Sequence, residues 1–325
     1  MKKILGIGNA LVDILVKLQN DEPLRKLNLP KGSMQLIDQT TMQRIAEATS
    51  TYTQHTASGG SASNTIVALA RLGCHVGFIG KVGHDSLGTF YSDDLTNNGV
   101  TPHLLKSNLP SGRCNVLISA DSERTMATYL GAAVTLNAED IDINIFRQYD
   151  ILHIEGYLVQ NYDLISRAAQ LAKEAGLTIS IDLASYNIVA ENIDFLQDFV
   201  SKYVDIVFAN EDEATAFTNQ PAEQAVHTLA QQTSLAIVKV GAKGSYIKQA
   251  NTLFHIPAEK VKPIDTTGAG DIYAAGFLYG YANNLPLNRC AEIGTLCAGH
   301  VIEEIGAKIT HERWQKIHKS LNNIL

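Results

Sequence analysis

The most informative segment of the chain reads Asp265-Thr266-Thr267-Gly268-Ala269-Gly270-Asp271 and leads directly into the apolar run Ile272–Phe277. Gly268, Ala269 and Gly270 leave room for a ligand to approach the backbone at the expected start of a helix. Their N–H groups, with those of the first helical turn, lie at the positive end of the helix dipole, where anions bind. The segment therefore predicts an anion pocket of the kind that holds a phosphate.

Asp271 stands at the same point, and a carboxylate beside a phosphate pocket repels the phosphate unless it has a task. The task that we infer is to accept the proton of an attacking hydroxyl as a phosphoryl group arrives. The alternative is that Asp271 only caps the helix, because aspartate is a favoured N-cap residue.

Outward from this segment, short apolar runs alternate with longer amphipathic stretches, with no repeat and no linker. Strands are expected at residues 3–7, 75–80, 151–154, 178–182, 206–209 and 235–240. Helices are expected at residues 40–48, 62–72, 87–97, 162–175, 190–202, 222–232, 271–282 and 289–304. The alternation predicts one α/β domain over residues 1–325, built on a parallel sheet that helices cover on both faces. Ligands of such sheets bind beyond the carboxyl ends of the strands.

Two segments, residues 16–38 and 101–131, break the rhythm because neither has a good helical period. The second holds strand-like patches at residues 114–119 and 125–129, with turn residues at 110–112 and 121–122. We expect the two segments to pair into a small β-sheet that stands off the main one. Such a sheet would serve as a lid, which enzymes use to keep water from reactive phosphates.

A second motif, Gly59-Gly60-Ser61-Ala62-Ser63-Asn64, precedes another expected helix. Its two glycines let the chain pass close to a ligand, Ser61 is placed to cap the helix, and Asn64 projects from the first turn. Backbone amides and an asparagine suit the hydroxyls of a polyol or a ribose. An ordinary helix start would have the same residues.

Two polar residues, Asn9 and Asp13, follow the first apolar strand. A buried unpaired carboxylate is costly, so Asp13 calls for a partner. Acceptance of hydrogen bonds from two vicinal sugar hydroxyls would supply one, and a capping role is the alternative.

Asn210 and Glu213 follow the apolar strand 205–209 and lie three residues apart at a helix start. Both can face one point, where they would hold the water shell of Mg²⁺ near phosphates. A capping box is the competing interpretation. Further on, Lys239 ends a strand that enters a turn between Gly241 and Gly244, and this turn would lie over a nucleotide phosphate or close a plain hairpin.

Together these elements resemble the ribokinase-like (PfkB) family of carbohydrate and nucleoside kinases, from Gly8 to about Gly306. The stretches 59–73 and 265–276 resemble the two signatures of that family, and Asn210/Glu213 its Asn-x-x-Glu. The resemblance implies a Rossmann-like αβα domain with a small β lid, and ATP-dependent phosphorylation of a primary hydroxyl.

The resemblance also implies roles for individual residues. Asp271 would be the general base, and Gly268, Ala269 and Gly270 the anion hole. Thr266, Lys239, Gly241 and Gly244 would bind the nucleotide, with Asn210, while Glu213 would hold Mg²⁺ through water. Asn9, Asp13, Gly59, Gly60 and Asn64 would bind the acceptor. A monovalent cation such as K⁺ would bind near the loop 264–266, where no single side chain marks it.

For the acceptor, the spacing Gly-Asn-x-x-x-Asp at the first strand is similar to adenosine kinases. Gln35 lies in a stretch similar to the lid strand near the purine, and Tyr157 would stack on the base. Arg124 matches a basic lid residue near the phosphates. The alternative for Tyr157 is a half-buried tyrosine with no ligand, and the alternative for Arg124 is a solvated turn residue. We therefore expect adenosine as the acceptor, phosphorylated on its 5′-hydroxyl, with ribose, fructose or 2-keto-3-deoxygluconate as the alternative.

Composition narrows the remaining classes. Lys and Arg total 26 and Asp and Glu 33, a formal charge of −7, which argues against nucleic acid or an anionic membrane as the main partner. Four scattered cysteines and no long apolar run favour a cytoplasmic protein. Gly6-Ile7-Gly8-Asn9-Ala10-Leu11 lacks the third glycine of a dinucleotide-binding oxidoreductase, and Asp271 argues against a non-catalytic binding module. The sequence leaves monomer and homodimer open.

Overall fold

The computed structural model describes residues 1–121 and 123–324. Within these residues, nine strands form one large sheet and five form a second, smaller one. The large sheet has the order β14-β13-β12-β11-β10-β9-β1-β5-β6. Its strands are β1 Ile4–Ile7, β5 Val76–Gly83, β6 Val100–Ser107, β9 Ile151–Glu155, β10 Thr178–Asp182, β11 Ile206–Asn210, β12 Leu235–Lys239, β13 Ser245–Gln249 and β14 Thr252–Ile256. All neighbours from β12 to β6 pair in parallel, and β13 and β14 extend the sheet beyond β12 as an antiparallel edge.

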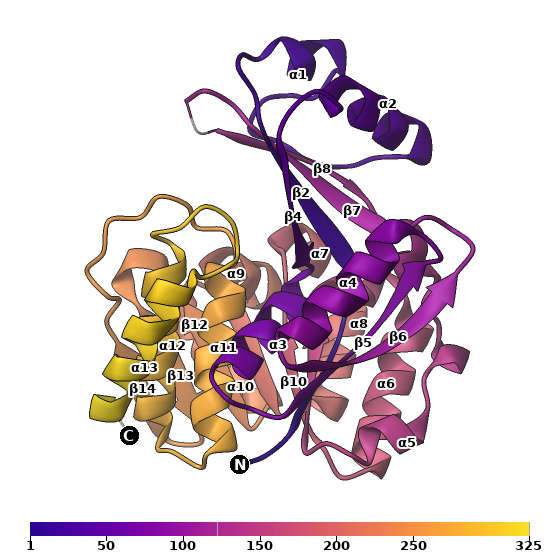
Figure 1. Cartoon of the computed structure of the whole chain (residues 1–325). Coiled ribbons are helices and arrows are strands. Elements are labelled where there is room, and N and C mark those ends of the chain that lie inside the picture. Colours follow the sequence, from indigo (N-terminus) through magenta and orange to yellow (C-terminus); the bar gives the residue numbers. More distant parts are fainter. Residues whose placement is uncertain (122, 325) are drawn as a thin grey trace.

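Helices cover both faces of the large sheet, as the continuous apolar strands indicated (Figure 1). The α-helices are α1 Glu22–Lys26, α2 Gln39–Thr49, α3 Ser61–Arg71, α4 Ser86–Asn97, α5 Ile143–Phe146, α6 Tyr162–Glu174, α7 Tyr186–Glu191, α8 Ile193–Tyr203, α9 Glu211–Thr218, α10 Ala222–Gln232, α11 Ala269–Ala282, α12 Leu287–Val301 and α13 His311–Ile324. Ile4 belongs to the core that includes residues of α3 and α11, and its neighbour Leu5 belongs to the second core, which includes residues of α6 and α10. The predicted α/β fold is confirmed.

The second sheet stands off the main one and has the order β3-β8-β7-β2-β4 (Figure 1). Its strands are β2 Leu11–Lys17, β3 Met34–Leu36, β4 Gln54–Gly59, β7 Gly112–Ile118 and β8 Arg124–Tyr129. Helices α1 and α2 cover its outer side. We call this sheet the lid.

The lid differs from the segments 16–38 and 101–131 in three respects. It begins at Leu11, because the chain passes from β1 into β2 after three residues. It includes β4, whose sequence Gln54–Gly59 is polar and gave no strand signal. Residues 100–107 form β6 instead, which pairs in parallel with β5 at the edge of the large sheet. Residue 122, in the turn expected at 121–122, lies outside the described residues.

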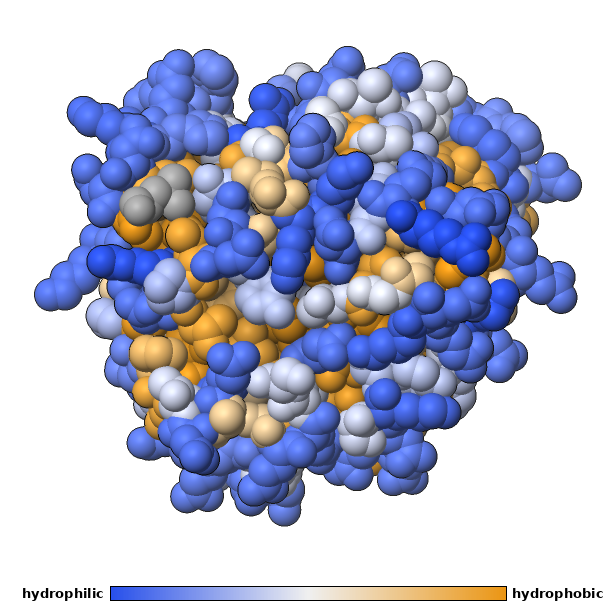
Figure 2. Space-filling view, turned by 90° about the horizontal axis from the view of Figure 1, so that it is seen from below, coloured by the Kyte–Doolittle hydropathy of each residue, from blue (hydrophilic) through white to orange (hydrophobic). Residues whose placement is uncertain are grey.

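The face opposite the lid is shown from below in Figure 2. Hydrophilic residues predominate on it, and apolar residues show between them. Among the described residues, no helix is both long enough and apolar enough to cross a bilayer.

Candidate active site

A cavity of about 740 Å³ lies at the carboxyl ends of the central strands. Asp182 from the end of β10, Asn210 from β11 and Lys239 from β12 line it, together with Asp271 at the start of α11. The volume lies within the roughly 300–1,000 Å³ of ligand sites, and the position is the one that parallel sheets provide for ligands.

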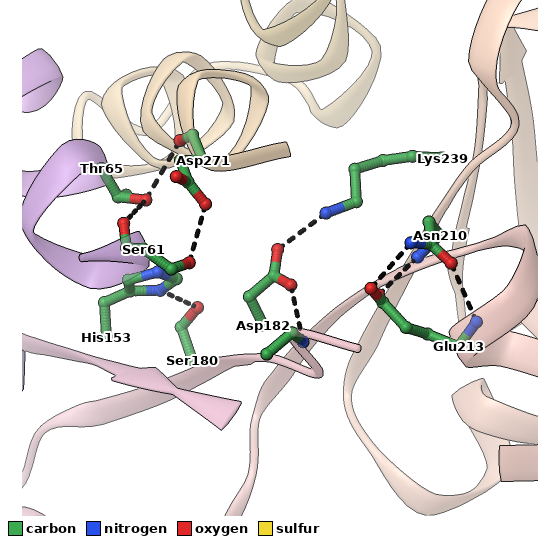
Figure 3. A network of polar contacts seen from close by, with 10 residues as sticks. Ser61, Thr65, His153, Ser180, Asp182, Asn210, Glu213, Lys239 and Asp271 are labelled. Atoms are coloured by element: carbon green, nitrogen blue, oxygen red, sulfur yellow. Dashed lines mark hydrogen bonds and ion pairs between the residues drawn. The ribbon is translucent and has the colours of Figure 1, made fainter. Parts of the chain in front are cut away.

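Asp271 is held by the first turn of α3 (Figure 3). Ser61 Oγ donates to its Oδ1 at 2.7 Å, and Asn64 Nδ2 donates to its Oδ2 at 3.0 Å. Ser61 was expected to cap α3, but the N-cap is Gly60 and the Ser61 hydroxyl serves Asp271 instead. Burial raises the pKa of Asp271 to about 7, against the lowering effect of these two hydrogen bonds. A carboxyl group with this pKa suits proton transfer near neutral pH.

The Gly-rich segment begins α11 as predicted. Gly268 is the N-cap, with φ +73°, and a Cβ there would lie 2.5 Å from the Cβ of Ala307, so glycine is required. The N–H of Ala269 donates to Thr266 O at 3.2 Å, which removes it from the expected anion hole. The amides of Gly268, Gly270 and Asp271 remain directed at the helix N-terminus, where intrahelical acceptors are lacking.

Lys239 brings a positive charge to the same place. A Cβ on Gly270 would lie only 3.0 Å from Lys239 Nζ, so the ammonium adjoins the anion hole. Lys239 Nζ also donates to Asp182 Oδ2 at 2.7 Å, in an ion pair whose side chains are 14% and 8% exposed (Figure 3). Burial alone would lower the pKa of Lys239, but the carboxylates of Asp182 and Glu213 outweigh it and raise the pKa.

Asn210 and Glu213 do form the capping box that was the competing interpretation. Asn210 Oδ1 accepts from Glu213 N, while the Glu213 carboxylate accepts from the backbone and side chain of Asn210 at 2.8 and 2.7 Å. Burial and the nearby Asp182 raise the pKa of Glu213 to about 7. Each carboxylate oxygen keeps a further lone pair, so this oxygen-rich wall fits a hydrated divalent cation, which would relieve the repulsion between the two carboxylates.

The turn after β12 also borders the cavity. Gly241 begins a short 3-10 helix between the antiparallel strands β12 and β13, and Gly244 follows it. Both glycines line the cavity with Thr266. The turn is therefore a hairpin connection that also faces the pocket.

Asp13, which is expected to bind the acceptor, lies on β2 beside β4. The Asp13 carboxylate occupies the space that a side chain at Gly59 would need, because a Cβ there would lie 2.4 Å from Asp13 Oδ1. Burial raises the pKa of Asp13 to about 6, opposed by the positive charges of Lys308 and Arg124.

Asn9 makes a contact that the sequence did not predict, and its binding to the acceptor stays a prediction. Its Nδ2 donates to Glu155 Oε1 at 2.7 Å, and the buried Glu155 also accepts from the backbone of Asn9 and of Ala62. Glu155, at the end of β9, thus holds the start of α3 in place. Asn9 supports this contact between β9 and α3 through the Nδ2 group of its side chain.

Gln35 was wrongly assigned to the acceptor pocket. Strand register places Asp13, Cys114, Thr128 and Leu36 on one face of the lid, and Ile14, Asn115, Ala127 and Gln35 on the other. The second face packs against α1 and α2, as Ile14 and Ala127 show. Because side chains alternate along a strand, Met34 and Leu36 share the face of Asp13 in place of Gln35. Both are 65% exposed.

Arg124, at the start of β8, connects the lid to the Gly-rich segment. Its Nη2 donates to Asp265 Oδ1 and to Thr267 Oγ1. The Asp265 carboxylate also accepts from Thr267 N at 2.9 Å and Gly306 N at 2.6 Å. Arg124 is therefore an ion-paired residue beside the anion hole, not a solvated turn residue.

Tyr157 lies in the short 3-10 helix after β9 and lines the cavity with Ser61 and Asp182. It thus lies beside the residues that are expected to bind phosphate, and its stacking on a base stays a prediction.

Three further residues escaped the sequence reasoning. Asp182 and Glu155 each end a parallel strand. A polar residue at this position could have been predicted as a site residue, because ligands bind beyond the carboxyl ends of such strands. Lys308 follows α12 and donates to Ser58 Oγ and Asn64 Oδ1, both at 3.3 Å. No local pattern marks it.

The cavity of about 740 Å³, the helix N-terminus of α11 and the buried carboxyl group of Asp271 are features that a kinase of small molecules requires. The model of the pfkB family of carbohydrate kinases matches residues 32–314, and the chain belongs to that family.

Relatives of known structure and name divide between two kinds of acceptor. An adenosine kinase from Sinorhizobium meliloti is 33% identical, with a TM-score of 0.87 over 98% of this chain and 99% of that one. A probable sugar kinase from Rhizobium etli CFN 42 is 31% identical, with a TM-score of 0.88 over 100% and 99%. A 5-dehydro-2-deoxygluconokinase from Geobacillus thermodenitrificans is 30% identical over 80% of this chain and 82% of its own length.

Proposed function

We propose that this PfkB-family kinase transfers the γ-phosphoryl group of ATP to the 5′-hydroxyl of a ribonucleoside, with adenosine as the preferred acceptor. One observation carries the nucleoside assignment. The inner face of the lid offers Met34 and Leu36, both 65% exposed, on the same face as the carboxylate of Asp13. A nucleoside has an apolar base and vicinal hydroxyls, so it matches both features, whereas a free sugar presents hydroxyls on all sides.

In the proposed reaction, the acceptor hydroxyl lies against Asp271, which takes its proton as the oxygen attacks the γ-phosphorus. Ser61 and Asn64 fix the carboxylate in place, at 2.7 and 3.0 Å. The bond from the γ-phosphorus to the bridging oxygen breaks, and ADP leaves with that oxygen. The amides of Gly268 and Gly270 stabilise the negative charge on the transferring group.

Lys239 supplies the remaining positive charge from the protein. Its ammonium adjoins Gly270 and lies 2.7 Å from Asp182 Oδ2, so it is held at the edge of the anion hole before the nucleotide binds. Glu213 and Asp182 would hold hydrated Mg²⁺, which neutralises phosphate charge when bound.

For a monovalent cation, the loop 264–266 offers one anionic side chain, that of Asp265. This carboxylate is already engaged by Arg124, Thr267 and Gly306. A K⁺ ion there would depend on backbone carbonyl groups, and no step of the proposed reaction passes through it.

A sugar kinase is the second candidate, and the names of some relatives support it. Kinases named for 5-dehydro-2-deoxygluconate are 26–30% identical to this chain, and a probable sugar kinase shares its whole length. A sugar acceptor would bind Asp13 through its hydroxyls and would leave the apolar lid face without a contact.

The test is ATP turnover with Mg²⁺ against adenosine, inosine, ribose, fructose, 5-dehydro-2-deoxygluconate and 2-keto-3-deoxygluconate, with Asp271→Ala as the blank. We expect adenosine to give the highest kcat/KM, and Asp271→Ala to lower kcat by several orders of magnitude. Preference for a free sugar would refute the nucleoside assignment and retain the kinase. A loss of less than about tenfold in Asp271→Ala would remove Asp271 as the base.

A further inference from the structure

Lys308 contacts Asn64, which is expected to bind the acceptor, and has no role in the reaction described so far. It follows α12, and its partly buried ammonium donates to Asn64 Oδ1 and Ser58 Oγ, both at 3.3 Å. Asn64 in turn donates its Nδ2 to Asp271 Oδ2 at 3.0 Å. A single side chain, Asn64, therefore separates the ammonium from the carboxylate.

The chemistry of the three groups fixes which way the Asn64 amide points. An ammonium can only donate hydrogen bonds, and an ionised carboxylate can only accept them. The amide between them must therefore present its oxygen to Lys308 and its NH₂ group to Asp271. A proton on Oδ2 of Asp271, the oxygen that faces Asn64, would be accepted by the amide only if the amide turned its oxygen toward Asp271. That turn would direct the NH₂ group at the ammonium.

We propose that Lys308 is a positioning residue that locks the amide of Asn64 in the orientation favouring the ionised form of Asp271. It acts through Asn64 and does not itself touch the reacting atoms. The inference rests on the proposed function only where it concerns catalysis. The lock on the carboxyl group is a property of the free protein.

Other charges face the same groups. Asp182 and Lys239, from the ends of β10 and β12, act on Asp271 in opposite directions and form an ion pair with each other. Asp13 from β2, Asp94 from α4 and Arg71 from α3 act on Lys308. Because direct charge effects are present as well, the test must separate them from the path through Asn64.

The test is the titration of the Asp271 carboxyl carbon by NMR in the full-length protein labelled with ¹³C-aspartate, assigned by the signal lost in Asp271→Asn. Lys308→Met is measured in the natural background and in an Asn64→Leu background. Lys308→Arg keeps the charge, and Lys81→Met removes another partly buried ammonium, which pairs with Asp140. Melting curves establish that each variant is folded.

We expect Lys308→Met to raise the pKa of Asp271 by about one unit, the equivalent of one charge-assisted hydrogen bond. In the Asn64→Leu background the same substitution should shift it by less than about a third of that. Lys308→Arg and Lys81→Met should leave it in place. An equal shift in both backgrounds would show a direct charge effect and overturn the proposal, as would no shift at all.

If Lys308→Met does not fold, Lys308→Gln replaces it, because an amide can face either orientation of Asn64 and so cannot lock it. The kinetics then separate this inference from the proposed function. An acid limb of kcat/KM that fails to follow the NMR pKa would refute Asp271 as the base and leave the lock standing. An acid limb that matches Asp271 but ignores Lys308 would refute the lock alone.

Discussion

Ser61→Ala should lower kcat/KM, and the size of this loss should depend strongly on pH. The Ser61 hydroxyl donates to Asp271 Oδ1 at 2.7 Å, and this bond favours the ionised carboxylate. The pKa of Asp271 is raised by burial to about 7, so the base is active above pH 7 and is lost as the pH falls through 7. Removal of the bond raises the pKa further, because the ionised form loses a donor and burial is unchanged.

The size of the effect follows from the value of one hydrogen bond to a charged group. At about 1.5 kcal/mol, its loss raises the pKa by about one unit, to roughly 8. At pH 7 the ionised fraction then falls from about one half to about one tenth, so kcat/KM drops about fivefold. At pH 9 both proteins are ionised, and the loss should be below about twofold.

The assay is kcat/KM against pH between 5.5 and 9.5, since this ratio reports the groups of the free enzyme. Thr65→Val is the matched control. Thr65 Oγ1 donates at 3.1 Å to the backbone carbonyl of the same Asp271, so its removal should leave the acid limb in place. A Ser61→Ala loss that is equal at all pH values, with an unmoved acid limb, would refute the reasoning.

Three further outcomes are expected. Leu36→Ser should raise the KM for adenosine about fivefold or more and leave turnover of any free sugar unchanged, because only a base would bury this side chain. An unchanged KM for adenosine would contradict binding of the base to the apolar lid face. Lys239→Met should destabilise the fold by about 3–5 kcal/mol in urea denaturation, because it leaves Asp182 buried and unpaired, and Lys239→Met with Asp182→Asn should regain stability but not activity. Arg124→Gln should speed hydrogen exchange in β7 and β8, because the lid loses its contact with Asp265; unaltered exchange would show that this contact does not hold the lid.

The parts of the site that are contiguous in sequence were predictable. Gly268 and Asp271 belong to one segment, and a helix N-terminus brings their groups together without help from elsewhere. The parallel sheet was predictable for a similar reason, because strands buried on both faces are apolar throughout and need no knowledge of their neighbours.

What the sequence did not show depends on register and on distant contacts. Gln35 was misplaced because one residue of register exchanges the two faces of a strand, and the register of β3 is set by its pairing with β8. That Asn64 binds an acceptor hydroxyl stays a prediction, but its contacts with Asp271 and Lys308 were not foreseen. Strand β4 was missed because its polar sequence lacks alternation.

The distance along the chain between the groups of the site has a consequence for folding. Ser61 and Asp271 are 210 residues apart, and Lys308 and Ser58 are 250 apart. Contacts of such long range close large loops and form slowly, after local helices and neighbouring strands. The contacts that hold Asp271 in the site should thus form late in folding. In refolding from urea, the circular dichroism signal of the helices should return before kinase activity does. A growing chain that has not yet released residue 308 would lack the complete site, and so would be unable to transfer phosphate before folding is finished.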